Sequence, residues 1–177
     1  MATLGAATSI AADPFHPGGL VAANGGTHLF RSRDEGLDWA AFAAAVAEPG
    51  LQQVAPSPAR PGLLYVAGDG GVYASLDGGR TFGRAGTGLP RGLVSSLLPD
   101  PAHPDQLYTG VATSFSQDPG ELGVYVSRDR GATWSRLGAG LPAGLFSGPL
   151  ALDAAHRLLY AGTIGAGVYR LRLPGRP

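Results

Sequence analysis

Short apolar runs rich in valine, leucine and tyrosine alternate along the chain with glycine and proline, which predicts β-strands separated by tight turns. No ten-residue stretch shows a clear helical period of 3.6 residues. In the third quarter of the chain, the pattern predicts four strands at residues 93–98, 106–112, 124–127 and 133–137. The stretch Trp39–Glu48 would tolerate a helix, but its alignment with the other repeats predicts an outer strand and a connection. The pattern therefore favours an all-β fold.

Two series of turn motifs recur along the chain and stay in step. The first series reads Ser-x-Asp-x-Gly-x-(Thr or Asp)-aromatic, with its aspartates 43 and 52 residues apart at Asp34, Asp77 and Asp129. The second series lies upstream of the first, with spacings of 44, 43 and 53 residues between Asp13, Ser57, Asp100 and Asp153. Because the two series keep the same phase, we infer one structural unit that recurs four times.

Each unit holds four expected strands in roughly 43–53 residues, which is typical of a β-propeller blade. We expect one propeller domain over residues 1–177, with blades at about 8–48, 51–90, 92–142 and 144–173. The last unit continues from Tyr169 as Arg-Leu-Arg-Leu without the second turn motif, so it is expected to lack its outer strand.

The residue types of the first motif suit a tight turn between the third and fourth strands. An aspartate there accepts hydrogen bonds from backbone N–H groups of its own turn, and a serine does so more weakly. Gly36, Gly79 and Gly131 are expected to supply a positive φ. The aromatic residue that follows then begins the outer strand and is expected to be buried between blades.

These motifs resemble the Asp-box, or BNR repeat, of sialidases, xyloglucanase-type glycoside hydrolases, sortilin-type receptors and photosystem II assembly factors. The resemblance implies that the Asp-box is a folding element that lies away from the ligand face. It therefore assigns a structural role to Ser32, Asp34, Gly36, Trp39, Ser75, Asp77, Gly79, Phe82, Ser127, Asp129, Gly131 and Trp134. Sialidases also need an arginine triad, a tyrosine nucleophile and a complete six-bladed ring, and no three arginines of this chain can be carried over to that triad.

An open array of blades would expose strand edges and apolar end faces, so we expect the chain to associate. Either two chains form an eight-bladed ring as a homo-oligomer, or this chain is part of a longer propeller, since the Asp-box relatives generally have six or more blades. The segment Met1–Ala6 is a candidate for the missing outer strand, because Thr3-Leu4-Gly5-Ala6 is similar to Arg136-Leu137-Gly138-Ala139.

Composition and charge exclude several classes of function. The chain is 44% hydrophobic and carries 13 basic and 13 acidic residues, so no nucleic-acid or membrane-surface partner is expected. It has no cysteine, which excludes disulfides and thiolate metal sites. Residues 1–14 contain no secretion signal. We therefore expect a cytoplasmic protein if the chain is full length and an extracytoplasmic one if it is a processed fragment.

The candidate ligand face is the one that carries the turns between strands two and three and the connections between blades. The third unit has an inserted loop there, over residues 111–122, with an aromatic residue, hydroxyl groups and two carboxylates. The ligand-face candidates are Phe115, Asp118, Glu121, Asp69 and Glu48. A glycosidase needs two carboxylates about 5–10 Å apart. In this chain they would be drawn from Asp69, Asp118 and Glu121.

No metal site or cofactor is expected. His16, His103 and His156 each follow an aspartate by three residues, but they fall in different blades. The glycine pairs lie between strands rather than before a helix, so they do not form a phosphate-binding loop.

Three functions fit the sequence. The first is a non-catalytic scaffold that binds a protein or glycan through the ligand face and the 111–122 loop, and this reading favours a protein that is not an enzyme. The second is a glycoside hydrolase fragment that acts on a polysaccharide. The third is a purely structural half-propeller whose partner is another copy of itself.

Overall fold

The computed structural model describes residues 6–42, 46, 50–112, 118–137, 147–163 and 165–174. These residues form four antiparallel sheets, which confirms the all-β prediction. The one helix among them is the 3-10 helix η1 (Pro119–Glu121), and no described helix has the length and apolar character needed to cross a bilayer.

Each sheet is a simple meander in which neighbouring strands follow one another in the chain. Blade 1 contains β1 (Ser9–Ala12), β2 (Leu20–Ala23), β3 (Leu29–Ser32) and β4 (Ala40–Phe42). Blade 2 contains β5 (Gln53–Pro56), β6 (Leu64–Gly68), β7 (Gly71–Ser75) and β8 (Gly83–Arg84). Blade 3 contains β9 (Val94–Pro99), β10 (Leu107–Val111), β11 (Gly123–Ser127) and β12 (Ser135–Arg136). Blade 4 contains β13 (Ser147–Asp153), β14 (Leu158–Thr163) and β15 (Gly167–Arg172).

Blade 4 is three-stranded in the part of the chain that the structure describes, as the sequence predicted. The stretch that tolerates a helix contributes strand β4 over residues 40–42. The candidate completing strand Met1–Ala6 lies outside the described residues except for Ala6.

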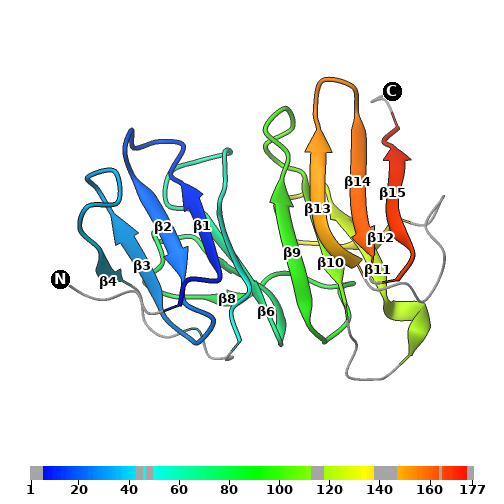
Figure 1. Cartoon of the computed structure of the whole chain (residues 1–177), viewed down its shortest axis with the longest axis horizontal. Coiled ribbons are helices and arrows are strands. Elements are labelled where there is room, and N and C mark those ends of the chain that lie inside the picture. Colours follow the sequence, from blue (N-terminus) through cyan, green and yellow to red (C-terminus); the bar gives the residue numbers. More distant parts are fainter. Residues whose placement is uncertain are drawn as a thin grey trace.

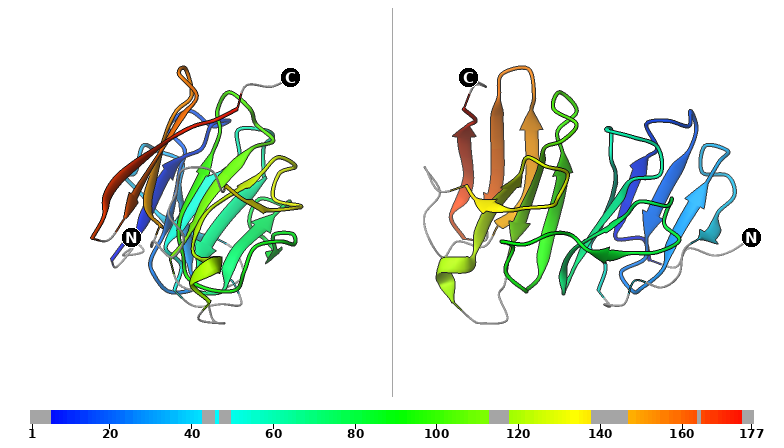
Figure 2. Two further views of the ribbon diagram at one scale, coloured as in Figure 1. Left: turned by 90° about the vertical axis from the view of Figure 1, so that its right-hand side faces the viewer. Right: turned by 180° about the vertical axis from the view of Figure 1, so that it is seen from behind.

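The four blades stand side by side in an arc, with the first strand of each blade on the inner side (Figure 1). Blades 1 and 4 lie at the two ends of the arc (Figure 1). Seen from the side, blades 1 and 4 lie toward one side of the molecule and blades 2 and 3 toward the other (Figure 2). The four blades therefore form an open arc, which we call the half-ring.

The burial pattern of the strands follows from this arrangement. In the inner blades, every residue of β6, β10 and β11 is buried, because a neighbouring blade covers each face of the sheet. In the end blades, β1 and β14 alternate between more and less buried residues, because only one of their faces is covered by a blade of this chain. The fully buried central strands β6, β10 and β11 thus mark the inner blades.

Three apolar clusters fill the spaces between successive blades. Val21, Val54 and Val66 lie between blades 1 and 2, Tyr65 and Leu107 between blades 2 and 3, and Tyr108 and Leu159 between blades 3 and 4. Adjacent residues of β6 point to opposite sides, so Tyr65 packs toward blade 3 while Val66 packs toward blade 1. Each blade is held mainly by burial of apolar area against its neighbours.

The three Asp-box turns share one hydrogen-bond pattern. In the second turn, the Ser75 hydroxyl donates to Asp77 Oδ1 (2.7 Å) and accepts from the Gly79 N–H (2.8 Å), while Asp77 Oδ1 accepts from the Thr81 N–H (3.0 Å). The matching glycines have positive φ, at 91° for Gly36, 92° for Gly79 and 88° for Gly131. The predicted turn chemistry is confirmed.

The aromatic residues of these turns do not all have the expected environment. Trp134 is buried between blades 2 and 3, and its indole N–H donates to the carbonyl of Ala85 in the preceding blade (3.2 Å). Phe82 is partly buried against the cluster between blades 1 and 2. Trp39 is only half-buried, and its N–H donates to Gly36 of its own turn (3.0 Å). The expectation of inter-blade burial is wrong for Trp39, because among the described residues no other blade packs on that side of blade 1.

Candidate functional site

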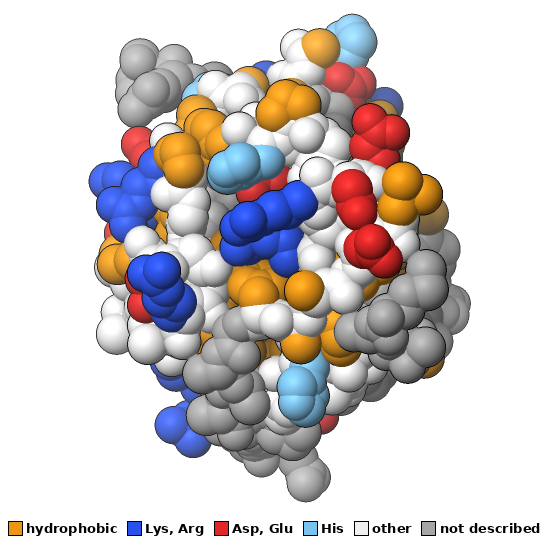
Figure 3. Space-filling model, turned by 90° about the vertical axis from the view of Figure 1, so that its left-hand side faces the viewer, with side chains coloured by type: hydrophobic (Ala, Val, Ile, Leu, Met, Phe, Trp, Pro, Cys, Tyr) orange, Lys and Arg blue, Asp and Glu red, His pale blue; other side chains and the backbone are white. Residues whose placement is uncertain are grey.

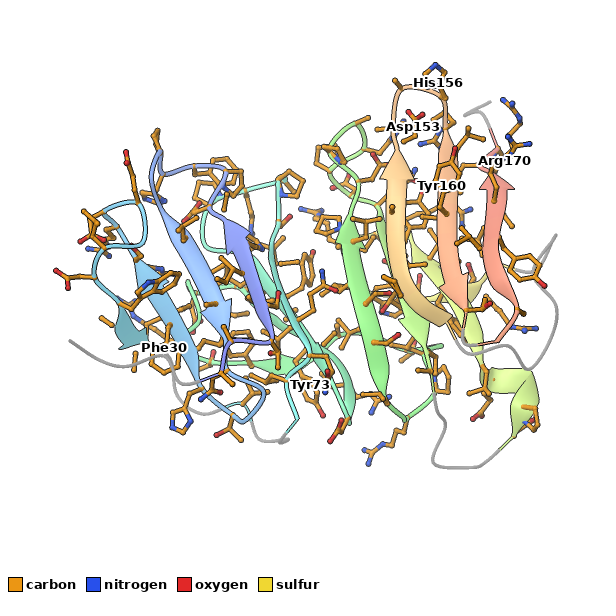
Figure 4. All side chains as sticks on the ribbon, viewed as in Figure 1. Phe30, Tyr73, Asp153, His156, Tyr160 and Arg170 are labelled. Carbon is orange, nitrogen blue, oxygen red and sulfur yellow. The ribbon has the colours of Figure 1, made fainter. Side chains whose placement is uncertain are left out.

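The strand ends define two faces of the arc. We call the end that carries η1 and the β6–β7 turn the loop face, and the opposite end, which carries the Asp-box turns, the Asp-box face. Asp153 and His156, in the β13–β14 turn, mark the Asp-box face at the top of Figure 4, and η1 lies at the bottom. The sequence-based candidates Asp69, Asp118 and Glu121 all lie on the loop face, in two neighbouring blades.

Asp69 lies at the tip of the β6–β7 turn of blade 2, and its side chain is exposed. A Cβ atom added to Gly50 would lie 2.2 Å from one carboxylate oxygen of Asp69, so the carboxylate rests directly on this glycine. Gly50 has a φ of 79°, which favours glycine for a second reason. The contact ties the β6–β7 turn to the connection between blades 1 and 2.

Asp118 and Glu121 belong to the end of the inserted loop. The Asp118 carboxylate accepts a hydrogen bond from the Gly120 N–H (2.7 Å) and caps the N-terminus of η1. The backbone carbonyl of Glu121 accepts from the Tyr125 hydroxyl (2.9 Å), and that of Leu122 accepts from the Arg136 guanidinium (2.9 Å). The end of the loop is thus anchored to blade 3 by side chains of β11 and β12.

Two of the five ligand-face candidates, Phe115 and Glu48, lie outside the described residues. The remaining three share a face, but the cavities described next are not lined by any of them. The proposed pairing of Asp69 with Asp118 or Glu121 therefore stays a prediction.

Among the cavities on the Asp-box face, two are lined by both arginine and histidine side chains, and each of these two lies between two blades. The larger, of about 380 Å³, lies between blades 3 and 4 and is lined by His103, Gln106, Tyr108, Arg128 and Arg157 among others. The smaller, of about 170 Å³, lies between blades 1 and 2 and is lined by His16, Arg31, Arg33 and Arg60 among others. Sequence reasoning missed both cavities, because each joins residues of different blades that no local motif connects.

The three repeated histidines each pair with the aspartate of their own turn. The Nδ1–Oδ2 distances are 2.9 Å for His16 and Asp13, 3.1 Å for His103 and Asp100, and 2.7 Å for His156 and Asp153. Hydrogen bonds from the backbone and side chain of His156 lower the pKa of Asp153. Within the described ranges, no three histidine or acidic side chains converge as a metal site would require.

The Asp-box carboxylates are held ionised by their own turns. Hydrogen bonds from Asp38 and Ser32 lower the pKa of Asp34, and bonds from the backbone and hydroxyl of Thr81 lower the pKa of Asp77 strongly. These aspartates therefore serve as hydrogen-bond acceptors of the turn and are poorly suited to proton transfer near neutral pH.

Comparison with known proteins supports the fold. The BNR/Asp-box repeat family matches residues 125–136, which contain the third Asp-box turn. A xyloglucanase of Hypocrea jecorina (strain QM6a) is 26% identical over 149 residues, which are 83% of this chain and 17% of that enzyme.

Two solved structures extend the comparison. The GH74 enzyme of Niastella koreensis matches with a TM-score of 0.72 and 19% identity, over 94% of this chain and 28% of that one. The structure of YCF48 bound to D1 peptide matches with a TM-score of 0.61 and 12% identity, over 96% of this chain and 55% of that one. Both neighbours are β-propellers, and this chain spans less than a fifth of the xyloglucanase and about half of the YCF48 chain.

Proposed function

Because the chain is a BNR/Asp-box propeller protein, we propose that it is a non-catalytic scaffold that binds a protein or glycan partner through its loop face. The observation that carries the proposal is the connection between β10 and β11. It spans residues 112–122, whereas residues 69 and 70 alone make the equivalent turn of blade 2. A long loop with an anchored end, on a rigid set of blades, is the usual form of a propeller binding surface.

The local contacts of the loop-face acids support a binding role over a catalytic one. Asp118 caps η1, and the Asp69 carboxylate rests on Gly50. A glycosidase instead needs two carboxyl groups that face a shared cleft across the scissile bond. The YCF48 structure with a D1 peptide gives a precedent for a protein partner on a propeller of this shape.

A glycoside hydrolase fragment is the second candidate, and the xyloglucanase relative favours it. In that case the catalytic acids would be drawn from Asp69, Asp118 and Glu121, and a polysaccharide such as xyloglucan would be the substrate.

Assays with xyloglucan distinguish the non-catalytic scaffold from the glycoside hydrolase. Retarded migration of the protein in a gel that contains xyloglucan, without release of reducing ends, would support the scaffold. A variant in which residues 112–122 are replaced by the two-residue Asp-Gly turn of blade 2 should then migrate freely, while Leu76→Arg on the opposite face should still be retarded. Hydrolysis that is lost in Asp118→Asn and Glu121→Gln would support the hydrolase instead. If the protein is not retarded and releases no reducing ends, xyloglucan is excluded as the ligand. That outcome would favour a purely structural half-propeller.

The scaffold is further proposed to be completed by a second copy of the chain. At the junction of blades 2 and 3, one segment joins both blades: the Ala85 N–H donates to Val72 of β7 (2.8 Å), and the Trp134 N–H of blade 3 donates to Thr87 (2.8 Å). At the blade 4 end of the half-ring, Val168 corresponds to the buried Val72 and is 73% exposed. At the blade 1 end, Leu37 corresponds to Ala132, whose carbonyl accepts from the Thr87 N–H (3.2 Å), and is 76% exposed. The blade 4 end thus presents an apolar residue that an adjoining blade would cover, and the blade 1 end presents a position at which an adjoining blade would form a backbone hydrogen bond.

The placement of the two end faces favours a second copy as that neighbour. Blades 1 and 4 lie toward the same side of the half-ring, so a two-fold rotation would bring blade 1 of each copy against blade 4 of the other (Figure 2). The end of the molecule that carries blade 1 exposes apolar side chains among arginine and histidine side chains (Figure 3). Such a mixed surface is typical of a contact between subunits.

Leu37→Arg should therefore abolish a dimer that sedimentation velocity detects, while Leu76→Arg, at an equally exposed leucine of an inner blade, should not. Equal sedimentation of both variants and the parent chain would exclude this interface.

A further inference from the structure

We propose that the cavity between blades 3 and 4 on the Asp-box face binds a small oxyanion, a carboxylate, sulfate or phosphate group, through Arg128, Arg157 and His103. This site is on the face opposite the loop face, and it does not depend on the function proposed for that face. Its volume of about 380 Å³ falls within the range of small-molecule sites.

The cavity lies where the described part of blade 4 carries no Asp-box turn. Between blades 2 and 3, the hydroxyl of Tyr65 donates to the backbone carbonyl of Arg130 in the Asp-box turn of blade 3 (3.0 Å). Tyr108 occupies the equivalent position one blade later, but its hydroxyl donates to Gln106 of its own blade (3.0 Å). Among the described residues, no turn of blade 4 receives the Tyr108 hydroxyl, and Tyr108 lines the cavity.

A buried carboxylate positions two of the three proposed ligand-binding groups. The Asp100 side chain is 0% exposed, and its Oδ2 lies 3.2 Å from Nη1 of Arg157 and 3.1 Å from Nδ1 of His103. Arg157 also donates to the carbonyl of Pro174 (3.2 Å), and its backbone has a φ of 55°. The Arg157 guanidinium is thus held through both of its terminal nitrogens, so little side-chain entropy remains to be lost when a ligand binds.

Arg128 supplies the charge that an anion would neutralise. It lines the cavity from the Asp-box turn of blade 3, and among the described residues it forms no salt bridge, whereas Arg157 is paired with Asp100 and Arg130 with Asp105. Burial and the charge of Asp100 raise the pKa of the Tyr108 hydroxyl, and the charges of Arg157 and Arg128 oppose that rise. Guanidinium groups bind planar or tetrahedral oxyanions with paired N–H donors.

The internal repeats show that the junction of blades 2 and 3 lacks this set of cations. Leu76 stands in blade 2 where Arg128 stands in blade 3, and Pro104 stands in blade 3 where Arg157 stands in blade 4. The junction of blades 2 and 3 therefore has neither arginine. The same comparison shows that a leucine is tolerated at the Arg128 position of an Asp-box turn.

Calorimetric titration of the intact chain at constant ionic strength tests the site. The probes are sodium sulfate, sodium phosphate and glucuronate, with glucose as the neutral counterpart of glucuronate. We expect saturable binding of at least one oxyanion and none of glucose. Arg128→Leu should weaken that binding at least about tenfold, because it removes a charge-assisted contact. The matched control Arg91→Leu removes an exposed arginine from the connection between blades 2 and 3 and should leave binding unchanged.

Three results would overturn the proposal. The first is no saturable binding of any of the three anions to a chain whose circular dichroism is that of a folded β protein. The second is equal weakening by Arg128→Leu and Arg91→Leu, which would indicate a non-specific effect of net charge. The third is binding of glucose as tight as that of glucuronate. The pattern among the three anions identifies the class: preference for glucuronate indicates a carboxylate ligand, and preference for sulfate or phosphate indicates a tetrahedral one.

Discussion

The two tryptophans of the chain occupy equivalent positions in different surroundings, and the account predicts that their removal has unequal effects. Trp134 is 5% exposed and donates a hydrogen bond to Ala85 of the preceding blade. Trp134→Ala should lower the free energy of unfolding by about 3–5 kcal/mol, the cost of truncating a buried large aromatic side chain. Trp39 is half-buried and bonds only within its own turn, so Trp39→Ala should cost about 1–2 kcal/mol.

Urea denaturation followed by fluorescence measures both values, because each variant retains one tryptophan as the reporter. The emission of Trp134 in the Trp39→Ala variant should be shifted to shorter wavelength than that of Trp39 in the Trp134→Ala variant, since Trp134 is better shielded from water. If a second copy covers blade 1, the loss of unfolding free energy caused by Trp39→Ala should rise with protein concentration. The loss caused by Trp134→Ala should be the larger of the two at every concentration. Equal costs in dilute solution would refute the inference that Trp39 lacks a neighbouring blade.

Three further changes test particular contacts. Gly86→Ala should destabilise the chain by about 2–4 kcal/mol in thermal unfolding. Gly86 has a φ of 64°, and a Cβ there would lie 2.2 Å from the carbonyl oxygens of Gly131 and Ala132. The control is Gly83→Ala, because a Cβ at Gly83 meets nothing within 4 Å. Arg157→Gln should cost about 3–5 kcal/mol because it leaves the buried Asp100 without its arginine. Arg130→Gln, which breaks an exposed pair with Asp105, should cost less than about 1 kcal/mol, and equal costs in chemical denaturation would contradict the burial argument. The Asp34 and Asp77 carboxyls have pKa values below those of the unfolded chain, so their contribution to stability should be complete above about pH 4 and be lost as the pH falls further. The melting temperature should therefore decline between pH 7 and pH 2, and the decline should be smaller in Asp77→Asn.

The fold was predictable from the sequence because its turns are determined by the chemistry of a few neighbouring residues. The Asp-box turns need a serine, an aspartate and a glycine at fixed spacing, and the hydrogen bonds of Ser75 and Asp77 confirm that reasoning. The three-stranded form of blade 4 among the described residues was equally predictable, since the motif is absent after Tyr169. Features set within one blade could thus be derived from the order of residues alone.

Features that depend on contacts between blades were less predictable. The exposure of Trp39 depends on the absence of a preceding blade, so its motif could not distinguish it from Trp134. The cavity beside Tyr108 depends on what the next blade lacks, and Arg128 and Arg157 meet there from turns about 30 residues apart. A comparison of equivalent positions across the four repeats, Tyr65 with Tyr108 and Leu76 with Arg128, was the signal in the sequence that could have indicated this site.

The arrangement of the blades around a shared axis, completed by a second copy, is tested most directly by electron-microscope class averages of the native particle viewed along that axis. The account predicts closed rings with a central channel, of the size expected for two chains of 17.9 kDa each. Isolated open crescents at every protein concentration, or particles in which the sheets pack face to face without a central axis, would contradict it.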